Sequence, residues 1–460
     1  MPFLIGVEVD NWRAVILAAG RGTRMMSSVP KVLQPICGRE MVGLVADSLR
    51  DAGFYDTVAV VPPDSPDICD VVMQHATLVE QREPLGTGHA LSKAQTLLGD
   101  YQGDVLVING DVPLITPDTL RALIQHHSSS QAYLTILTCD GVSLDGMGRV
   151  IRDEDENVTA IVEEAELNAA AAGVSEINVG IYCLKSPWLW NALEKLSPSA
   201  KGEIYLTDLV AEAASQGRKV EAVLLKDNEE ALGVNDGIQL AKTREVVQRR
   251  INNKWLLNGV TVMDPAFIDV TVELEQDTTI YPNTFLRGNT VIGKGCQIGP
   301  GSIIESSVIA DGCRVLHSVI EEAVLEERVE VGPYSHVRPD SHIETGVHIG
   351  NFAEVKNSRL GKGTKVGHFS YVGDSWVGHN VNVGAGAVTC NFDGIGKHQT
   401  IIEEGAFIGS DCMLVAPVRI GAGASTGAGS VVTKDVPAGA LVVGIPAKRV
   451  PNGRPQPTQE

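Results

Sequence analysis

The chain has 460 residues, of which 43% are hydrophobic and 20% are charged, and its formal net charge at pH 7 is -20. This length exceeds one ordinary hydrophobic core and predicts two domains. The acidic balance argues against a nucleic-acid surface, because phosphate backbones select basic patches. It is compatible with small phosphorylated substrates that a few local lysines and arginines hold.

The cysteines and the apolar stretches indicate the compartment. The eight cysteines are scattered without paired C-x-x-C spacing, which is typical of reduced thiols in a cytoplasm rather than of disulfides or zinc ligands. Residues 1–10 lack a basic segment followed by a long apolar run, so we expect no secretory signal. No stretch approaches about eighteen consecutive apolar residues, so we expect no membrane insertion. The expected location is the cytoplasm.

A short apolar run over residues 13–18 predicts a buried parallel strand that leads into a glycine-rich loop. The loop reads A-A-G-R-G-T-R-M over residues 18–25. Met25 stands where a dinucleotide-binding loop has its third glycine, and no Walker Gly-Lys-Ser/Thr follows. Backbone N–H groups together with Arg24 and Lys31 suit a triphosphate, although a plain strand-to-helix turn remains the alternative.

The full string, G-x-G-T-R-M followed by S-x-x-P-K, resembles the signature loop of sugar-1-phosphate nucleotidyltransferases. The resemblance implies a Rossmann-like α/β domain that transfers a nucleotide from a nucleoside triphosphate. In that family Arg24 and Lys31 act in catalysis by neutralising phosphate charge.

The following elements alternate as in an α/β sandwich. Helical spacing marks 41–50, a strand is expected at 57–61, and the G-T-G of residues 86–88 opens another helix. An apolar strand at 105–108 ends in Asn109-Gly110-Asp111, which places a carboxylate where open α/β sheets bind ligands. Asp111 therefore suits Mg²⁺, with a simple turn as the alternative. Thr116 followed by Pro117 predicts a helix N-terminus.

Further motifs match the nucleotidyltransferases in chain order. They are Gly146 before Gly148-Arg149, Glu163 in I-V-E-E, Asn178 in E-I-N-V-G, the E-x-Y-x-T-D segment of 203–208, and Gly233-Val234-Asn235-Asp236. The resemblance implies that Gln81, Gly86 and Thr87 face the nucleobase, that Gly146, Glu163 and Asn178 hold the sugar, and that Asn235 shares the metal with Asp111. The complete set implied to bind the nucleotide or nucleotide sugar is Leu17, Ala18, Ala19, Gly20, Lys31, Gln81, Gly86, Thr87, Asn109, Asp111, Gly146, Glu163, Asn178 and Asn235.

Apolar positions at Leu240, Val247, Ile251 and Trp255 mark one face of a long helix over residues 236–257. We interpret this helix as the linker between a nucleotidyltransferase domain of residues 1–235 and a second domain of residues 258–460. Residues from about 451 onward are expected to form a disordered tail.

The second domain contains an aliphatic residue every six positions, usually followed by a small or acidic residue, between Ile292 and Val432. A period of six is neither helical nor that of a single strand; it predicts short strands separated by corners, stacked into a parallel β-helix. We expect the glycines to provide the unusual backbone angles of the corners. The repeat resembles hexapeptide-repeat acyltransferases, which implies a left-handed coil.

Polar residues on successive coils carry the acyltransferase interpretation. Arg338 and Lys356 are eighteen positions apart, so two cations stack on one edge if about three hexads make a turn, as suits a phosphate. The resemblance makes His368 a general base toward an amine, and we expect Glu354 to orient its imidazole. Implied sugar-phosphate ligands are Arg338, Lys356, Tyr371, Asn382, Asn391 and Phe392, and implied acetyl-coenzyme A ligands are Ala385, Ser410 and Ala428. Phe392 and Ile445 replace a tyrosine and an arginine found in relatives.

Together the two halves resemble the bacterial family of bifunctional UDP-N-acetylglucosamine pyrophosphorylase/glucosamine-1-phosphate N-acetyltransferases. The resemblance implies acetyl transfer from acetyl-coenzyme A to glucosamine-1-phosphate, then uridylyl transfer from UTP to N-acetylglucosamine-1-phosphate, with Mg²⁺ and a homotrimeric assembly. Two alternatives remain at this point. One is a nucleotidyltransferase such as a glucose-1-phosphate adenylyltransferase, whose β-helix only regulates or assembles; the other is a non-enzymatic scaffold.

Overall fold

The computed structural model describes residues 9, 11–20, 22–140, 146–167, 171 and 173–450. The chain divides into two compact units, residues 1–247 and 248–460, and the division falls within helix α7 (Gly237–Leu257). The predicted disordered tail from about residue 451 lies outside the described residues.

The first unit contains a mixed sheet in the order β11-β7-β10-β6-β1-β4-β5, with β8 and β9 as an attached pair. The strands are β1 (Trp12–Leu17), β4 (Thr57–Val61), β5 (Thr77–Glu80), β6 (Asp104–Asn109), β7 (Leu134–Cys139), β8 (Arg149–Arg152), β9 (Val158–Val162), β10 (Ile177–Lys185) and β11 (Val220–Leu224). A separate two-stranded hairpin joins β2 (Pro35–Ile36) to β3 (Arg39–Glu40). Strand β1 pairs in parallel with both β4 and β6, whereas β10 runs antiparallel to β6 and β7.

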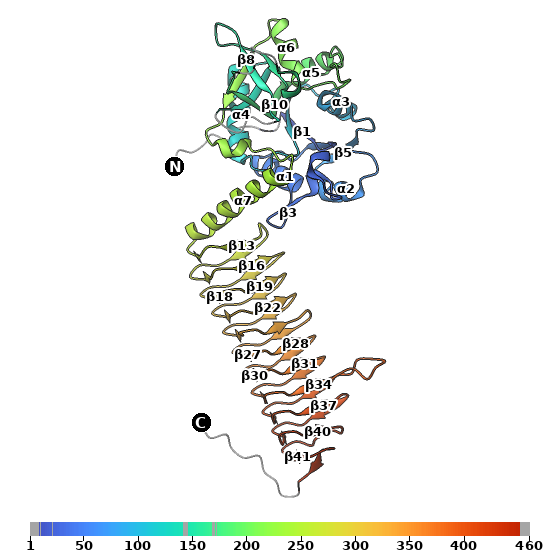
Figure 1. The fold of residues 1–460 in the computed structure, drawn as a ribbon, viewed down its shortest axis with the longest axis vertical. Helices are drawn as coiled ribbons and strands as arrows, with labels where there is room; N and C mark the ends of the chain where they lie inside the picture. Colours follow the sequence, from blue (N-terminus) through green and yellow to red (C-terminus); the bar gives the residue numbers. More distant parts are fainter. Residues whose placement is uncertain are drawn as a thin grey trace. The chain divides into compact units, whose positions relative to one another are not determined.

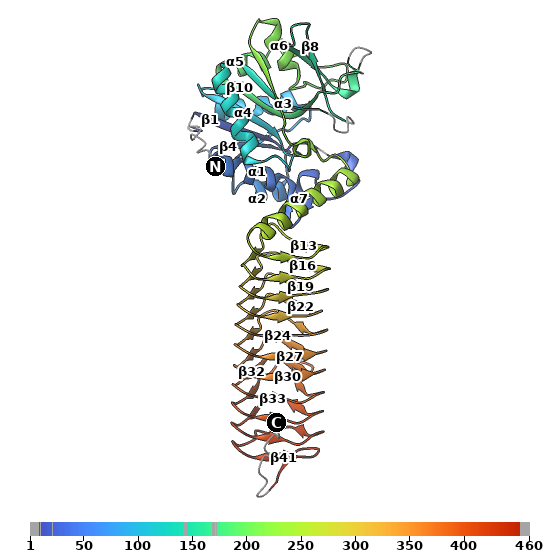
Figure 2. The same cartoon turned by 90° about the vertical axis from the view of Figure 1, so that its left-hand side faces the viewer.

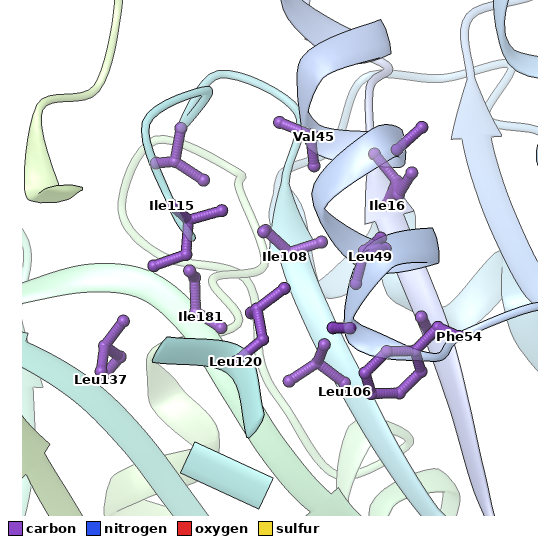
Figure 3. Close-up of a cluster of buried hydrophobic side chains, with 14 of the residues drawn as sticks. Ile16, Val45, Leu49, Phe54, Leu106, Ile108, Ile115, Leu120, Leu137 and Ile181 are labelled. Carbon is purple, nitrogen blue, oxygen red and sulfur yellow. The ribbon is translucent and has the colours of Figure 1, made fainter. Parts of the chain in front are cut away.

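Helices cover the sheet on both faces, because successive residues of a strand point to opposite sides. The helices are α1 (Met41–Ala52), α2 (Pro66–Val72), α3 (Thr87–Leu98), α4 (Pro117–Ser130), α5 (Ser186–Leu193) and α6 (Asp208–Ser215). Ile16 and Ile108 belong to one buried cluster with Leu49 of α1 (Figure 3). Val15 and Val107 face the other cluster, which includes residues of α3, α5 and α6. Each central strand is therefore apolar on both sides.

The predicted elements of this unit are confirmed with small shifts. The strand expected at 57–61 is β4, and the strand expected at 13–18 lies one residue earlier. Helix α1 continues to Ala52 and ends at Gly53, whose φ of 108° allows its N–H to reach the carbonyls of Arg50 and Leu49. The predicted helix start is also confirmed, since Thr116 Oγ1 accepts a hydrogen bond from the Thr119 N–H at 3.2 Å.

The apolar stripe that predicted a long helix is buried along α7. Leu240, Val247, Ile251 and Trp255 are each at most 9% exposed. Ile238 and Leu257, at the two ends of the helix, are more than 80% exposed at 83% and 88%. The seven- and four-residue spacing thus identified the side of the helix that packs against protein.

The second unit is a three-sided parallel β-helix, in which every third strand from β12 to β40 belongs to the same sheet (Figures 1 and 2). At the end of the first sheet, β41 pairs with β39, and β42 runs antiparallel to β41. Face 1 contains β12 (Thr261–Val262), β15 (Thr279–Ile280), β18 (Gln297–Ile298), β21 (Arg314–Val315), β24 (Glu330–Val331), β27 (His348–Asn351), β30 (Lys365–His368), β33 (Asn382–Val383), β36 (Phe407–Ile408), β39 (Ser425–Thr426), β41 (Leu441–Val443) and β42 (Lys448–Arg449). Face 2 contains β13 (Ala266–Ile268), β16 (Thr284–Arg287), β19 (Ile303–Glu305), β22 (Val319–Glu321), β25 (His336–Val337), β28 (Glu354–Lys356), β31 (Tyr371–Gly373), β34 (Val388–Cys390), β37 (Met413–Val415) and β40 (Val431–Val432). Face 3 contains β14 (Glu273–Leu274), β17 (Val291–Ile292), β20 (Val308–Ile309), β23 (Val324–Leu325), β26 (His342–Ile343), β29 (Arg359–Leu360), β32 (Ser375–Val377), β35 (Thr400–Ile402) and β38 (Val418–Ile420).

The six-residue repeat corresponds to one strand and one corner. Its aliphatic residues fill the interior of the coil: Ile304, Ile320 and Val337 lie in register on successive turns of face 2 and are fully buried. All aliphatic residues of the predicted hexads are at most 5% exposed. The predicted fold class, an α/β nucleotidyltransferase-like domain followed by a hexapeptide-repeat β-helix, is confirmed.

We expected the glycines of the hexads to provide unusual backbone angles at the corners, and for most of them this explanation is wrong. Gly332 does adopt a positive φ of 106°, but Gly378, Gly384 and Gly409 do not, and close stacking explains them instead. A Cβ on Gly378 would lie 2.6 Å from the Glu404 amide nitrogen, and one on Gly384 would lie 2.6 Å from the Ser410 amide nitrogen. Neighbouring turns approach so closely at these positions that a side chain would collide with backbone.

Truncation inside this column should weaken the stack locally. We expect Ile320→Ala to lower the free energy of opening of the surrounding turns by about 2–5 kcal/mol, because the cavity is enclosed by rigid neighbours. Native-state hydrogen exchange of the backbone amides in β19, β22 and β25 measures this change. Val415→Ala, an aliphatic truncation at a 37% exposed position of the same face, is the control and should change the opening free energy by less than about 0.5 kcal/mol. Equal effects of the two substitutions would contradict the assignment of Ile320 to the core.

Candidate active sites

The signature loop holds Lys31 against two polar residues from distant parts of the chain. The Lys31 Nζ atom lies 2.5 Å from Asp111 Oδ2 and 3.2 Å from Asn235 Oδ1, and an Arg24 nitrogen donates to the same Asn235 oxygen at 2.9 Å. A Cβ at Gly22, whose φ is 60°, would collide with the Lys31 side chain. The second glycine of the motif therefore makes room for the lysine.

Two cavities adjoin this cluster at the carboxyl ends of the strands. The larger cavity has a volume of about 590 Å³ and is lined by Leu17, Ala19, Gly20, Arg24, Lys31, Gln81, Gly86 and Thr87, among others. The smaller cavity has a volume of about 210 Å³ and is lined by Gly146, Glu163, Asn178 and Asn235, among others. Thr87, Asn109, Asp111 and Tyr205 line both. The structure thus brings together the predicted nucleotide-binding residues with one exception, Ala18, which is fully buried and whose N–H bonds to the Val60 carbonyl at 2.8 Å.

The amide of Gln81 has a defined orientation in the larger cavity. Its Nε2 atom donates to the Gly86 carbonyl at 3.1 Å and lies 3.0 Å from His89 Nδ1. A carbonyl accepts only, so the nitrogen must face Gly86 and the amide oxygen is left to accept a bond from a ligand. Burial lowers the pKa of His89, which keeps Nδ1 available as an acceptor for Gln81.

The 203–208 segment closes over the G-T-G loop. A Cβ at Gly86, whose φ is 100°, would lie 2.5 Å from the Ile204 carbonyl oxygen, and Thr87 Oγ1 accepts from the Leu206 N–H at 3.0 Å. Glu203, Tyr205 and Thr207 line the cavities but were not among the predicted site residues. Their alternate spacing along an extended segment is the sequence signal that could have identified them.

A half-buried carboxyl group faces the smaller cavity. Thr207 Oγ1 donates to Glu163 Oε1 at 2.8 Å. Burial raises the pKa of Glu163, an effect that the Thr207 hydrogen bond opposes and that the nearby Asp208 charge reinforces. The partly buried Glu163 thus differs from its sequence neighbour Glu164, which is exposed.

The charges around Lys31 fit a divalent cation. The ammonium group contacts both Asp111 and Asn235, so two oxygen atoms from separate segments already converge on one positive charge. One carboxylate and one amide oxygen are the small protein ligand set that Mg²⁺ uses beside phosphates. Among the residues that the structure describes, no cluster of three or more His, Cys, Asp or Glu side chains could hold a metal.

In the second unit, the predicted cation stack is confirmed on face 2. Val337 and Val355 pair in register, which places Arg338 and Lys356 on adjacent turns. Lys397 comes within hydrogen-bonding reach of Lys356, and this contact and its charge lower the pKa of Lys356. Asn391 connects two polar residues, because its Nδ2 atom lies 3.3 Å from the Tyr371 hydroxyl and 2.5 Å from Asp374 Oδ2. Three cations on one surface favour a phosphate ligand.

His368 lies on face 1 and does not meet Glu354. Its Nδ1 atom lies 3.1 Å from Asn351 Oδ1, because Asn351 and His368 are register partners on successive turns. Glu354 instead accepts from Arg338 at 2.8 Å on face 2. Within one chain, the expected contact between Glu354 and the imidazole is therefore absent, and Asn351 takes that position. With Nδ1 donating to Asn351, Nε2 is the nitrogen that can accept a proton.

The remaining residues predicted for the acyltransferase site lie on face 1 and at the corner that follows it. Asn382 belongs to β33 of face 1, and Ala385, Ser410 and Ala428 follow β33, β36 and β39 at one corner. Hydrogen bonds between turns stack this corner: the Asp411 N–H donates to the Ala385 carbonyl at 2.7 Å and the Gly429 N–H to the Ser410 carbonyl at 2.8 Å. The cations suited to phosphate, Arg338 and Lys356, and the histidine, His368, therefore lie on two different faces of one chain.

The loop that interrupts the hexads is held by its own polar groups. Asp393 Oδ1 accepts from the Ile395 and Gly396 N–H groups at 2.8 Å each, and His398 Nε2 lies 2.7 Å from Asp393 Oδ2. These bonds lower the pKa of Asp393. Phe392 within the loop is 61% exposed, and Ile445 near the end is 77% exposed. Both replacements thus present apolar rather than polar groups.

A further hollow of about 570 Å³ lies on face 3 around Trp376, Ile401 and Arg419. Arg419 in its lining pairs with Glu403, and a second carboxylate, Glu404, gives the lining more negative than positive charge. It therefore does not favour a phosphate ligand, and it contains none of the predicted site residues.

These features define the class: a nucleotidyltransferase domain joined to a hexapeptide-repeat transferase domain. Residues 14–213 match the family of MobA-like NTP transferase domains, and residues 271–306 and 399–434 match the bacterial transferase hexapeptide family. The chain is 43% identical to a protein of Geobacillus sp. (strain WCH70) and 44% identical to one of Heliobacterium modesticaldum, each over 94% of both chains. It is 43% identical to a protein of Pelobacter propionicus over 95% of this chain and 96% of the relative. All three relatives are named "Bifunctional protein GlmU".

The chain belongs to the bifunctional GlmU family. This confirms the resemblance that the motifs of both halves predicted. The family also favours two activities over a single-activity adenylyltransferase or a scaffold. Within the described residues, no helix combines the length and the apolar character needed to cross a bilayer.

The raised pKa of Glu163 predicts a pH-dependent stability. Folding favours the protonated carboxyl group, so ionisation of Glu163 costs folding free energy as pH rises above its unfolded pKa of about 4.3. We expect Glu163→Gln to raise the Tm of the first unit at about pH 7 and to lose this advantage near pH 4. Calorimetry at both pH values measures the difference, with the exposed neighbour Glu164→Gln as control. A stabilisation of the same size at both pH values would contradict the role of ionisation.

Proposed function

We propose that the two domains catalyse consecutive steps: acetyl transfer from acetyl-coenzyme A to glucosamine-1-phosphate, then uridylyl transfer from UTP to the acetylated sugar phosphate. The observation that carries the proposal is that one chain has a cation cluster suited to phosphate in each domain. Lys31 and Arg24 form the first cluster, and Arg338, Lys356 and Lys397 form the second.

In the first domain, the larger cavity takes UTP and the smaller one takes the sugar phosphate. A phosphate oxygen of N-acetylglucosamine-1-phosphate attacks the α-phosphorus of UTP, and the bond to the bridging oxygen breaks to release pyrophosphate. Lys31 and Arg24 line the larger cavity and contact Asp111 and Asn235, which line the smaller one. They neutralise the charge that spreads over the phosphoryl oxygens. No protein nucleophile is required, and catalysis consists of positioning and charge neutralisation.

The orientation of Gln81 supports a uracil base. Its amide oxygen is the atom left to accept a hydrogen bond, because the nitrogen is held by Gly86 and His89. Uracil has an N3–H donor at its pairing edge, whereas the corresponding nitrogen of cytosine is an acceptor. A cytosine base would therefore place two acceptors together, which costs a hydrogen bond.

The same domain fits Mg²⁺, with Asp111 and Asn235 as its protein ligands. When bound, the ion supplies additional charge neutralisation and holds the triphosphate oxygens in position. Lys31 contacts both of these side chains in the structure. When the ion takes over these two oxygen atoms, the ammonium group becomes free to move toward the phosphates.

In the second domain, His368 is the general base. Its Nε2 atom accepts a proton from the amine of glucosamine-1-phosphate while the amine nitrogen attacks the thioester carbonyl, and the carbon–sulfur bond breaks to release coenzyme A. Arg338, Lys356 and Tyr371, with Asn382, Asn391 and Phe392, bind the sugar phosphate. The corner of Ala385, Ser410 and Ala428, which has small side chains, accommodates acetyl-coenzyme A.

The β-helix assembles with further copies of itself into a homotrimer. Outward-facing valines form a ladder on face 3, where Val291, Val308 and Val324 are 36%, 45% and 40% exposed. Tyr334 and Phe352 stack with ring centroids 5.4 Å apart at a corner and are both 59% exposed. Apolar rows of this kind favour burial against a second copy. Such an assembly also joins face 2 of one chain to face 1 of another and completes the acetyltransferase site.

Two substitutions should separate the activities. We expect Lys31→Ala to lower pyrophosphate release from UTP by about 10²-fold or more, and His368→Ala to lower thiol release from acetyl-coenzyme A by about 10²–10⁴-fold. Each variant should retain the other activity, because its substitution lies in the other domain. Wild-type pyrophosphate release without thiol release would instead show that the β-helix serves only as a platform.

Mixed assemblies should test whether two copies form one acetyltransferase site. Lys356→Ala and His368→Ala variants are each expected to lack thiol release. When the two variants are co-expressed from differently tagged chains and purified through both tags, they should regain about a third of the wild-type rate. One of the three sites in each mixed trimer then combines an intact Lys356 with an intact His368. No recovery in doubly tagged assemblies would place all the residues of a site on one chain.

A further inference from the structure

Strand β10 carries an irregularity beside the smaller cavity. Its pairing with β7 shifts register between Asn178 and Tyr182, and Gly180 between them has a φ of 84°. A Cβ at Gly180 would collide with the Asn109 amide, so only glycine fits this backbone. In a regular strand, residues four apart are separated by about 13 Å. The bulge instead brings the two side chains together, and Asn178 Nδ2 lies 2.6 Å from the Tyr182 hydroxyl.

The hydrogen bonds around Asn178 fix the role of each atom. The Gly180 N–H donates to Asn178 Oδ1 at 3.2 Å, so the amide oxygen is on that side and the nitrogen faces Tyr182. Tyr182 must then accept the Asn178 bond through its oxygen. Burial raises the pKa of Tyr182, so the phenol keeps its hydrogen at neutral pH. Among the described residues, Asn178 is the one hydrogen-bond partner of this hydroxyl, and its own hydrogen remains to be donated.

The phenol lines a polar cavity from a buried position. Tyr182 is 3% exposed, and it borders the cavity together with Glu163, Asn178 and Thr207. A buried hydroxyl hydrogen without an acceptor costs free energy, which a ligand oxygen in the cavity can recover. Tyr182 is not among the residues that the sequence predicts for the site, because an aromatic residue in a long buried strand is most often part of the core.

We propose that Tyr182 determines affinity for the sugar phosphate: its hydroxyl donates a hydrogen bond to a sugar oxygen and at the same time holds Asn178 toward the same sugar. The proposal rests on the assignment of the smaller cavity to the sugar phosphate under the proposed function. It also explains the bulge of β10, because a regular strand would keep the side chains of Asn178 and Tyr182 apart.

The first test is steady-state kinetics of pyrophosphate release by Tyr182→Phe, which removes the donor and retains the ring. We expect the KM for N-acetylglucosamine-1-phosphate to rise on the order of tenfold, as for a lost buried hydrogen bond. The KM for UTP and the rate of thiol release should stay within about twofold of wild type, because neither involves this cavity. Tyr133→Phe is the matched control; its hydroxyl bonds to Arg218 at 3.0 Å instead, and all its parameters should equal those of wild type. An unchanged sugar-phosphate KM in Tyr182→Phe would overturn the proposal.

The background of Asn178→Ala distinguishes a direct contact from a positioning effect. If Tyr182 touches the sugar, Tyr182→Phe also raises the KM in this background. If it acts only through Asn178, the second substitution adds nothing, and the direct contact is refuted. Calorimetric titration of wild type and Tyr182→Phe with N-acetylglucosamine-1-phosphate in the presence of UTP and Ca²⁺ measures binding without depending on turnover. Sugar-phosphate binding without pyrophosphate release by wild type would refute the proposed function and still test Tyr182.

Discussion

In-register stacking of parallel turns is the constraint on which the second domain depends. Each turn buries one aliphatic residue per face directly above its equivalent in the turn before, as Ile304, Ile320 and Val337 do. This register fixes every outward residue as well. Arg338 lies beside Lys356, and Asn351 lies beside His368, because their buried neighbours Val337 and Val355, and Ile349 and Val366, are paired. The chemistry on the surface is therefore positioned by the apolar interior.

The first domain positions its site by a different means. Segments far apart in sequence lie at the same edge of the mixed sheet, and their loops supply Lys31, Asp111 and Asn235 to one cluster. Glycines permit this convergence where space is short. Gly22 leaves room for Lys31, and Gly86 leaves room for the Ile204 carbonyl. Gly22 and Gly86 combine a positive φ with a close neighbour, whereas Gly378 and Gly384 of the β-helix are explained by the close approach of backbone alone.

Sequence reasoning was strongest where a period or a motif corresponds to one physical requirement. The six-residue period identified the buried column, and the apolar stripe from Leu240 to Trp255 identified the packed side of α7. It was weaker wherever two residues meet because of the pairing register between turns or strands, which cannot be read from the sequence. Glu354 lies close to Lys356 in sequence and was expected near His368, but the turns place Asn351 there. Tyr182 went unnoticed because nothing in a run of buried residues indicates a bulge.

The stacked architecture also means that the stability of each turn depends only on that turn and its two neighbours. Each turn of the β-helix pairs only with the turns before and after it, so disorder enters from the ends and decays along the stack. The Arg338 and Lys356 turns have several turns on either side, whereas between the corner at Ala428 and residue 450, where the described part of the chain ends, there are only β40, β41 and β42. Fraying at the carboxyl end would therefore loosen the last part of the small-residue corner well before it reached the cation stack. Within one chain, the cation stack and the small-residue corner are thus placed at different depths of a single cooperative array.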